Sequence, residues 1–227
     1  MIDTPKGRKI YVIIPAYNEQ DAIAKVINDI SKTLVTEIIV GNNNSKDQTA
    51  LVAKNAGATV VDAPQAGYGN ACLAGINYLR NKAQKQDIIV FIDGDYSDYP
   101  EELLKIIDPI WHHNYDMVIG SRVKALREKG AMTPQQIFGN ALATFLMKLF
   151  FNSKFTDLGP FRAIKYEKLI ALQMEDKTYG WTVEMQLKAL KQKLSYIEIP
   201  VRYKNRIGVS KVSGTVKGTI MAGVKII

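Results

Sequence analysis

One stretch limits the possible folds of this chain more than any other: an apolar strand pattern that runs directly into two carboxylates. Residues 88–92 read Ile-Ile-Val-Phe-Ile, which is typical of a strand buried on both faces of a parallel sheet. Asp93, Gly94 and Asp95 follow at once. Side chains two residues apart in extended chain point to the same side, so Asp93 and Asp95 should converge at the carboxyl end of the strand. Open α/β sheets bind their ligands at that end.

The two carboxylates predict a site for a divalent cation. Like charges repel at close range unless a cation lies between them, and a hard ion such as Mg²⁺ or Mn²⁺ prefers carboxylate oxygen. Gly94 has no side chain, so a ligand can approach the backbone there. The motif alone leaves a plainer alternative open, which is an Asp- and Gly-containing turn after a core strand.

The pattern around this strand predicts an α/β fold with a mostly parallel sheet and helices on both faces. Strand patterns at 9–14, 37–40, 59–61, 88–92 and 117–120 alternate with helical patterns at 19–31, 48–56, 71–85 and from 100 onward. The polar loops follow strands and should gather at one edge. Beyond Arg122 we expect helices at 140–151 and 182–191, a turn at 156–162 and a strand at 194–203. No linker interrupts the chain, so we expect one domain over 1–227.

Charge is unevenly distributed along the chain. Residues 1–100 hold 10 Lys and Arg against 11 Asp and Glu, a net of −1, whereas residues 101–227 hold 20 against 11, a net of +9. The second half therefore suits an anionic partner such as a phosphate, a nucleic acid or an anionic membrane surface, with a solvated basic surface as the alternative. The single cysteine, Cys72, excludes an internal disulfide and fits a reducing compartment and a structural, unreactive thiol. No signal peptide or apolar run of about 18 residues is seen, so we expect a cytoplasmic protein.

Several classes of nucleotide and metal site are excluded or disfavoured. A Rossmann dehydrogenase needs a Gly-x-Gly-x-x-Gly turn after its first strand, where this chain has Pro-Ala-Tyr-Asn-Glu at 15–19. The phosphate-binding loop Gly-x-x-x-x-Gly-Lys-Ser/Thr is also missing. His112 and His113 diverge on a helix and have no third ligand near them in sequence. A metal-assisted nucleotide site without those phosphate loops remains.

Six short motifs, in order, carry a resemblance to a known family. They are Ile14-Pro15-Ala16-Tyr17-Asn18-Glu19, Asn44-Ser45-Lys46-Asp47-Gln48-Thr49, Gly67-Tyr68-Gly69-Asn70-Ala71, Asp93-Gly94-Asp95, Gly120-Ser121-Arg122 and Asp157-Leu158-Gly159-Pro160-Phe161-Arg162. With them the chain resembles the inverting family 2 glycosyltransferases of the GT-A fold, and within these the dolichyl-phosphate mannose synthase-like and bacterial polyprenyl-phosphate enzymes. The resemblance covers nearly the whole chain.

The resemblance implies a nucleotide-sugar donor, a UDP- or GDP-sugar, in the half spanning 1–122. Asp93 and Asp95 would hold Mg²⁺ or Mn²⁺ against the diphosphate. Ser97, with Asp98 next to it, stands where close relatives carry a Gln ligand, so the third ligand stays open. The implied donor-binding residues are Pro15, Ala16, Tyr17, Glu19, Asn43, Gly67, Gly69, Asp93, Gly94 and Asp95. Asn42 and Asn43 replace a usual pair of Asp, of which one accepts the imide N–H of uracil, so the base preference stays open.

The second half, 123–227, is expected to bind the acceptor, and the acceptor decides the mechanism. A hydroxyl needs a general base, for which Glu184 is the candidate, although Glu184 also fits a solvated helix residue. A polyprenyl phosphate is already an anion and needs only positive charge to hold it in line. The candidate acceptor and phosphate residues are Arg122, Arg127, Lys129, Asp157, Arg162, Arg202, Arg206 and Lys211.

Other readings stay open at the level of sequence. The apolar helix 140–151 suits either plain core packing or a membrane face beside a lipid acceptor, and peripheral contact with the inner face of a membrane would follow from the second. The chain could also bind a sugar nucleotide without turnover, although the Asp93–Asp95 pair argues against this. A nucleotidyltransferase would need a Gly-rich basic loop after the first strand, which is missing. We expect no nucleic acid as partner.

Overall fold

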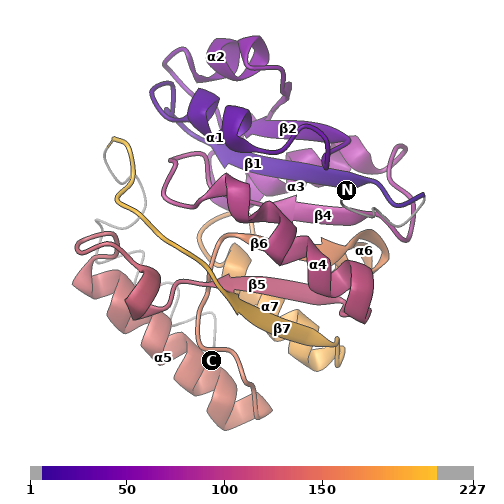
Figure 1. Ribbon diagram of the computed structural model, residues 1–227, viewed down its shortest axis with the longest axis vertical. Helices are drawn as coiled ribbons and strands as arrows, with labels where there is room; N and C mark the ends of the chain where they lie inside the picture. Colours follow the sequence, from indigo (N-terminus) through magenta and orange to yellow (C-terminus); the bar gives the residue numbers. More distant parts are fainter. Residues whose placement is uncertain (1–6, 209–227) are drawn as a thin grey trace.

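A computed structural model describes residues 7–208, and within them seven strands form one sheet in the order β3-β2-β1-β4-β6-β5-β7. The strands are β1 (Ile10–Ala16), β2 (Glu37–Asn42), β3 (Thr59–Asp62), β4 (Ile88–Phe91), β5 (Met117–Ser121), β6 (Arg162–Lys165) and β7 (Tyr196–Pro200). All neighbouring pairs are parallel except the two that β6 makes, with β4 and with β5. The predicted α/β fold with a mostly parallel sheet is confirmed (Figure 1).

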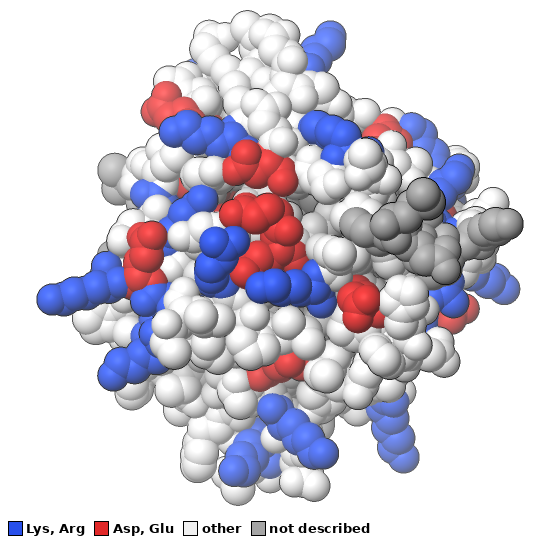
Figure 2. All heavy atoms as spheres, viewed as in Figure 1, with Lys and Arg blue, Asp and Glu red and all other residues white. Residues whose placement is uncertain are grey.

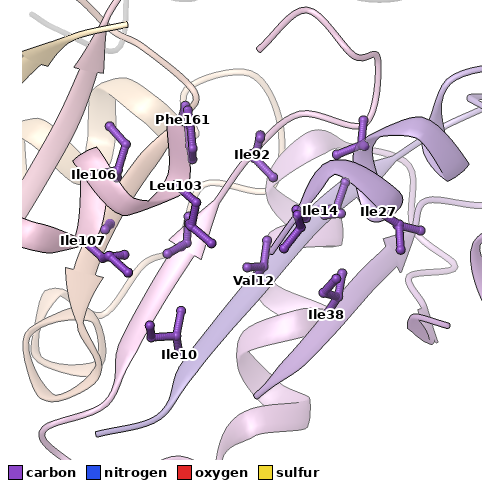
Figure 3. Packing of buried hydrophobic residues seen from close by; sticks show 14 of the residues in the cluster. Ile10, Val12, Ile14, Ile27, Ile38, Ile92, Leu103, Ile106, Ile107 and Phe161 are labelled. Atoms are coloured by element: carbon purple, nitrogen blue, oxygen red, sulfur yellow. The ribbon is translucent and has the colours of Figure 1, made fainter. Parts of the chain in front are cut away.

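Helices cover both faces of the sheet, as predicted. They are α1 (Ile23–Asp29), α2 (Thr49–Asn55), α3 (Tyr68–Leu79), α4 (Leu103–His113), α5 (Pro134–Phe151), α6 (Tyr166–Leu172) and α7 (Trp181–Lys191), with short 3₁₀ turns at Pro100–Glu102 and Lys124–Leu126. One core lies between the sheet and α1, α2 and α4, and Figure 3 shows part of it, with Val12 and Ile14 of β1 close to Ile27 of α1 and Leu103 and Ile106 of α4 close to Phe161. A second core on the opposite face contains residues of α3, α6 and α7.

Strand β1 can lie at the centre of the sheet because its side chains are buried on both faces. Tyr11 and Ile13 enter one core while Val12 and Ile14 enter the other, and all four are at most 2% exposed. Each such side chain contributes roughly 1.5–3 kcal/mol by leaving water. Cys72, on α3, is fully buried in the second core, and burial raises the pKa of its thiol, so its expected structural place is confirmed.

Three elements differ from the sequence prediction. The strand β6 and the helix α6 that follows it were not predicted; β6 has only four residues, and its antiparallel insertion between β4 and β5 leaves no local pattern. Helix α5 begins at Pro134, six residues earlier than the predicted 140. Thr133 explains this start, because its side chain accepts from Gln136 N while the Gln136 side chain accepts from Thr133 N, which forms a capping box before Pro134.

Helix α5 exposes an apolar stripe to solvent. Phe138, Phe145, Leu149 and Phe150 are each 60% or more exposed, and Ala143 and Met147 on the other side of the helix are buried. Plain core packing, one of the two readings of this helix, therefore accounts for only one of its faces. Among the described residues no helix is both long and apolar enough to cross a membrane.

Candidate active site

A pocket of about 270 Å³ opens at the carboxyl edge of the sheet, where the loops after β1, β2, β3 and β4 meet. Its walls are Pro15, Ala16, Tyr17, Glu19, Asn43, Asn44, Lys46, Ala66, Gly67, Tyr68, Ala71, Asp93, Gly94, Asp95, Tyr179 and Arg206. Nine of the ten residues expected at the donor site therefore line one pocket; Gly69 is the exception. The pocket forms here because parallel strands end together and their loops share one edge.

Asp93 and Asp95 both line this pocket and are held by different partners. The Tyr68 hydroxyl donates to Asp93 Oδ1 at 2.9 Å, and the backbone and hydroxyl of Ser97 donate to Asp95 Oδ1 at 2.9 and 2.6 Å. Burial, together with the charge of Asp95, raises the pKa of Asp93 to about 7. Burial also raises the pKa of Tyr68 well above its usual value, so its hydroxyl remains a donor.

Arg206 supplies a cation to Asp95. Its Nη1 lies 3.1 Å from Asp95 Oδ2, and its Nη2 lies 2.9 Å from Glu19 Oε1. The segment that carries Arg206 crosses the loop after β4, because Lys204 N donates to Ser97 O and Ile207 N donates to Asp95 O. Because the guanidinium pairs with both Asp95 and Glu19, the part of the pocket between these two carboxylates accommodates a positive charge.

The carboxylates suit Mg²⁺ or Mn²⁺, which are bound by oxygen and keep positions for water and substrate phosphate. Among residues 7–208, no group of three or more His, Cys, Asp and Glu is arranged to hold a metal ion. An ion here would therefore use Asp93 and Asp95 and complete its shell with diphosphate oxygens and water. Ser97 was the candidate third ligand, but it is 1% exposed and donates its hydroxyl to Asp95, so the structure makes it a support for Asp95.

Asn43 has its amide occupied by the protein. Its Oδ1 accepts from Gly67 N at 2.8 Å, and its Nδ2 donates to Gln65 O at 2.8 Å and Ala63 O at 3.3 Å. Both ends of this amide therefore hold the loop after β3, and the contact of Asn43 with a nucleotide base stays a prediction. An Asp could not donate to the two carbonyls, which gives a physical reason for Asn at this position.

Gly67 and Gly69, which were expected at the donor site, lie close to another segment of the protein. A Cβ on Gly69 would lie 1.9 Å from Asp176 O, and a Cβ on Gly67 would lie 2.0 Å from Lys177 O. The missing side chains of these two glycines therefore allow the loop between α6 and α7 to approach closely. Gly67 still reaches the pocket wall, but Gly69 does not.

Glu184 lies away from the Asp93–Asp95 pocket, in a separate surface depression on α7. Its Oε1 accepts from Glu175 N at 2.9 Å and its Oε2 from Asp176 N at 2.8 Å, and Lys188 Nζ lies 2.8 Å from Oε1. Both oxygens are therefore engaged with backbone and a lysine. The structure does not bring the candidate base to the predicted metal site.

Three of the seven basic residues expected to bind phosphate pair with acids: Arg122, Arg202 and Arg206. Arg122 makes a two-pronged contact with Asp157, with Nε and Nη2 at 2.8 and 2.7 Å from its two oxygens. Arg202 pairs with Glu102 at 2.9 Å and Glu101 at 3.1 Å. These partners could not be predicted from local sequence, because they lie 35 to 101 positions away. Figure 2 shows the resulting surface, where acidic side chains gather near the middle of one face with Lys and Arg beside them.

The remaining basic residues that were expected to bind phosphate have different surroundings. Arg162 is 1% exposed and donates to the carbonyls of Leu158, Gly159 and Thr182, so it is a buried support and is not available to a phosphate. Arg127 contacts Met132 Sδ, Lys129 is exposed, and Lys211 lies outside the described residues. Of the seven candidates within residues 7–208, Arg206 is the one that lines the pocket.

Sequence reasoning missed Tyr68, Tyr179 and Lys46 as pocket residues. Tyr68 lay inside the Gly67-Tyr68-Gly69 motif, where attention to the side chain between two glycines could have identified it. Tyr179 follows no strand and belongs to the loop before α7, so no local pattern marks it.

The model of glycosyl transferase family 2 matches residues 11–172, which include β1 to β6 and both carboxylates. The chain belongs to glycosyl transferase family 2. This family 2 glycosyltransferase is 29% identical over 217 residues to an uncharacterised glycosyltransferase of Mycobacterium tuberculosis, covering 95% of each chain. The family that the six motifs suggested is thereby confirmed.

Other relatives of this family 2 glycosyltransferase carry more specific names. It is 31% identical to a dolichyl-phosphate hexose transferase of Haloferax volcanii, over 88% of this chain and 85% of the relative. Among solved structures it resembles glucosyl-3-phosphoglycerate synthase of Mycobacterium tuberculosis in complex with Mn²⁺, UDP and glucosyl-3-phosphoglycerate. That match has a TM-score of 0.74 at 22% identity, over 97% of this chain and 78% of the other, and it shows the shared fold.

Proposed function

We propose that this glycosyltransferase moves a sugar, with inversion, from a UDP- or GDP-sugar to a polyprenyl phosphate, and that it uses Mg²⁺ or Mn²⁺. One observation carries the proposal: Asp93, Asp95 and Arg206 line one pocket, while Glu184 has both oxygens engaged elsewhere. The site thus offers charge to hold phosphates but not the base that was expected for a hydroxyl acceptor. A relative is named as a UDP-N-acetylglucosamine–dolichyl-phosphate transferase of Methanococcus voltae, at 29% identity over 85% of this chain.

The roles of the residues follow from their positions. The loop Pro15 to Glu19 and the loops after β2 and β3 would enclose the nucleoside, in the half spanning 1–122. Asp93 and Asp95 would hold the divalent ion, which when bound supplies Lewis acidity at the diphosphate leaving group. Arg206 would exchange its contacts with Asp95 and Glu19 for phosphate oxygens, since a guanidinium suits that geometry. The half spanning 123–227 would receive the acceptor.

The acceptor phosphate would attack the anomeric carbon directly. It is an anion at neutral pH and needs no proton removed, so the task of the protein is to hold it in line and to compensate charge. A hydroxyl acceptor would need a base at hydrogen-bond distance, and Glu184 is held by Glu175 N and Asp176 N.

The exposed stripe of α5 is proposed to contact an anionic membrane beside this site, on its inner, cytoplasmic face. Phe138, Leu142, Phe145 and Leu149 recur every three or four residues and are all exposed, so they form one apolar face. Residues 129–156 contain Lys129, Lys148 and Lys154 and no Asp or Glu. Apolar area and positive charge together favour an anionic lipid surface. Figure 2 shows the region of α5 as largely uncharged, with Lys and Arg at its margins.

The test of the acceptor is a transfer assay with radiolabelled UDP- and GDP-sugars, Mn²⁺, and two matched lipids, a short polyprenyl phosphate and the corresponding polyprenol. The proposal predicts a labelled lipid with the phosphate only, with inverted anomeric configuration by NMR. Transfer to the polyprenol or to simple sugars, but not to the phosphate, would assign a hydroxyl acceptor instead. Donor that binds without any transfer or hydrolysis would indicate a non-catalytic binding protein.

A further inference from the structure

Glu184 joins two segments by its carboxylate. Its two oxygens accept from consecutive backbone N–H groups, those of Glu175 and Asp176, at 2.9 and 2.8 Å. Hydrogen bonds to an ionised acceptor are the strong ones, and two of them on one side chain fix both position and orientation. Glu184 therefore ties the loop of residues 173–180 to the first turn of α7.

The same loop docks on the start of α3. Thr178 O accepts from Gly69 N at 3.2 Å, and Lys177 O accepts from Asn70 N at 3.1 Å. Helix α3 has no side-chain cap, so these carbonyls satisfy amides that a helix start leaves without a partner. The missing side chain of Gly69 permits this contact, since a Cβ there would lie 1.9 Å from Asp176 O.

The start of α3 is connected to the metal carboxylates. Tyr68 is its first residue and donates to Asp93 Oδ1 at 2.9 Å. Tyr68 also lines the pocket, as does Tyr179 from the docked loop. The chain of contacts thus runs from Glu184 through the loop to α3, and from Tyr68 to Asp93.

We infer that Glu184 is a positioning residue for donor binding, which acts by holding the 173–180 loop against α3 and so fixing Tyr68 and Asp93. The inference rests on the proposed function for the ligand of the pocket. It differs from the role of general base, because a base must reach the acceptor whereas a positioning carboxylate acts through Glu175 and Asp176. Groups that orient a metal ligand commonly contribute about 10- to 100-fold to binding or activity.

The first arm of the test needs no ligand. Amide hydrogen exchange is measured at Gly69 and Asn70 in the parent, Glu184→Gln and Glu184→Ala. We expect exchange to rise about tenfold or more in Glu184→Ala, since it loses two hydrogen bonds to a charged group, with a smaller rise in Glu184→Gln, which keeps one acceptor oxygen. Unchanged exchange in both variants, with the fold intact by circular dichroism, would overturn the inference.

The second arm measures Mn²⁺-dependent binding of UDP and of GDP by calorimetry, and separates KM for the donor from kcat. We expect Glu184→Ala to raise the dissociation constant of the preferred nucleotide and the donor KM about tenfold, with kcat much less affected. A Glu184→Gln variant that binds as the parent does but loses kcat would instead identify a base. If the parent binds neither nucleotide, the proposed function fails, while the exchange arm still decides the role of Glu184.

Two variants complete the design. Glu175→Gln is the matched control, because it removes a carboxylate from the same loop but its side chain is 83% exposed; we expect binding and exchange like the parent. Gly69→Ala breaks the same contact from the side of α3. If both substitutions act on one contact, the double variant Gly69→Ala/Glu184→Ala should raise the dissociation constant of the nucleotide by clearly less than the product of the two separate fold-changes. Multiplicative effects would contradict a shared contact.

Discussion

Arg206 Nη1 lies 3.1 Å from Asp95 Oδ2, so the segment after β7 places a fixed cation on a carboxylate that we assign to the metal site. A metal ion at Asp95 has to compete with this guanidinium or share the carboxylate with it. We therefore propose two tasks for Arg206, which are compensating the charge of Asp95 before the donor arrives and binding phosphate afterwards.

Arg206→Ala should therefore bind Mn²⁺ alone more tightly than the parent and transfer sugar more slowly. The first effect follows because no cation has to leave Asp95, and the second because phosphate loses a partner; we expect each change to be about tenfold, as for one charge-assisted hydrogen bond. Calorimetry with Mn²⁺ and initial rates with donor measure the two. Arg202→Ala is the control, since its partners are Glu101 and Glu102 outside the pocket. Equal or weaker Mn²⁺ binding in Arg206→Ala would contradict competition.

The raised pKa of Asp93 predicts an unusual dependence of stability on pH. Burial and the charge of Asp95 raise that pKa from 3.8 to about 7, so the folded state holds a proton that the unfolded state has lost. The free energy of unfolding should then fall as pH rises between about 5 and 7, because the folded state binds more protons over this interval. Urea unfolding without metal, compared with Asp93→Asn, measures the effect. A parent curve that parallels the curve of Asp93→Asn would show that Asp93 does not titrate there.

The buried pair of Arg122 and Asp157 predicts a large loss of stability on truncation. Their side chains are 10% and 6% exposed, so Asp157→Ala leaves a buried, unpaired guanidinium, which typically costs about 3–5 kcal/mol. The control is Asp108→Ala, which removes a half-exposed partner of His112 and should change stability by less than about 1 kcal/mol. Denaturant unfolding compares the two. Equal losses would mean that the pair at Asp157 is as weak as a surface pair.

The sequence predicted the parts of the site that depend on local pattern. Asp93 and Asp95 follow a strand whose burial was readable from five apolar residues, and the loops of β1 to β4 share one edge because parallel strands do. The rest depends on contacts between distant segments. Arg206 meets Glu19 across 187 positions, and Arg162 is buried because the four-residue β6 enters the sheet antiparallel. Nothing near either residue in sequence reveals its partner.

The apolar stripe of α5 predicts binding to anionic vesicles. Phe145→Glu replaces a 60% exposed ring by a charge and should lower the bound fraction on vesicles with anionic lipid several-fold, because apolar contact and charge attraction are both reduced. Leu51→Glu, on α2, is the matched control with a 54% exposed side chain. Vesicle sedimentation measures both. Binding that is lost equally in the two variants, or is missing in the parent, would contradict a membrane role for α5.

The most direct test of the whole account is a calorimetric titration of Asp95→Asn with Mn²⁺ and the preferred nucleoside diphosphate, beside the parent and an exposed control, Asp108→Asn. The central claim is that Asp93 and Asp95 together hold the ion that binds the diphosphate. It predicts metal-dependent nucleotide binding in the parent and in Asp108→Asn, and none in Asp95→Asn, whose fold stays intact because removing one of two repelling charges relieves the empty site. If Asp95→Asn binds Mn²⁺ and nucleotide as the parent does, the metal site lies elsewhere and the account is wrong.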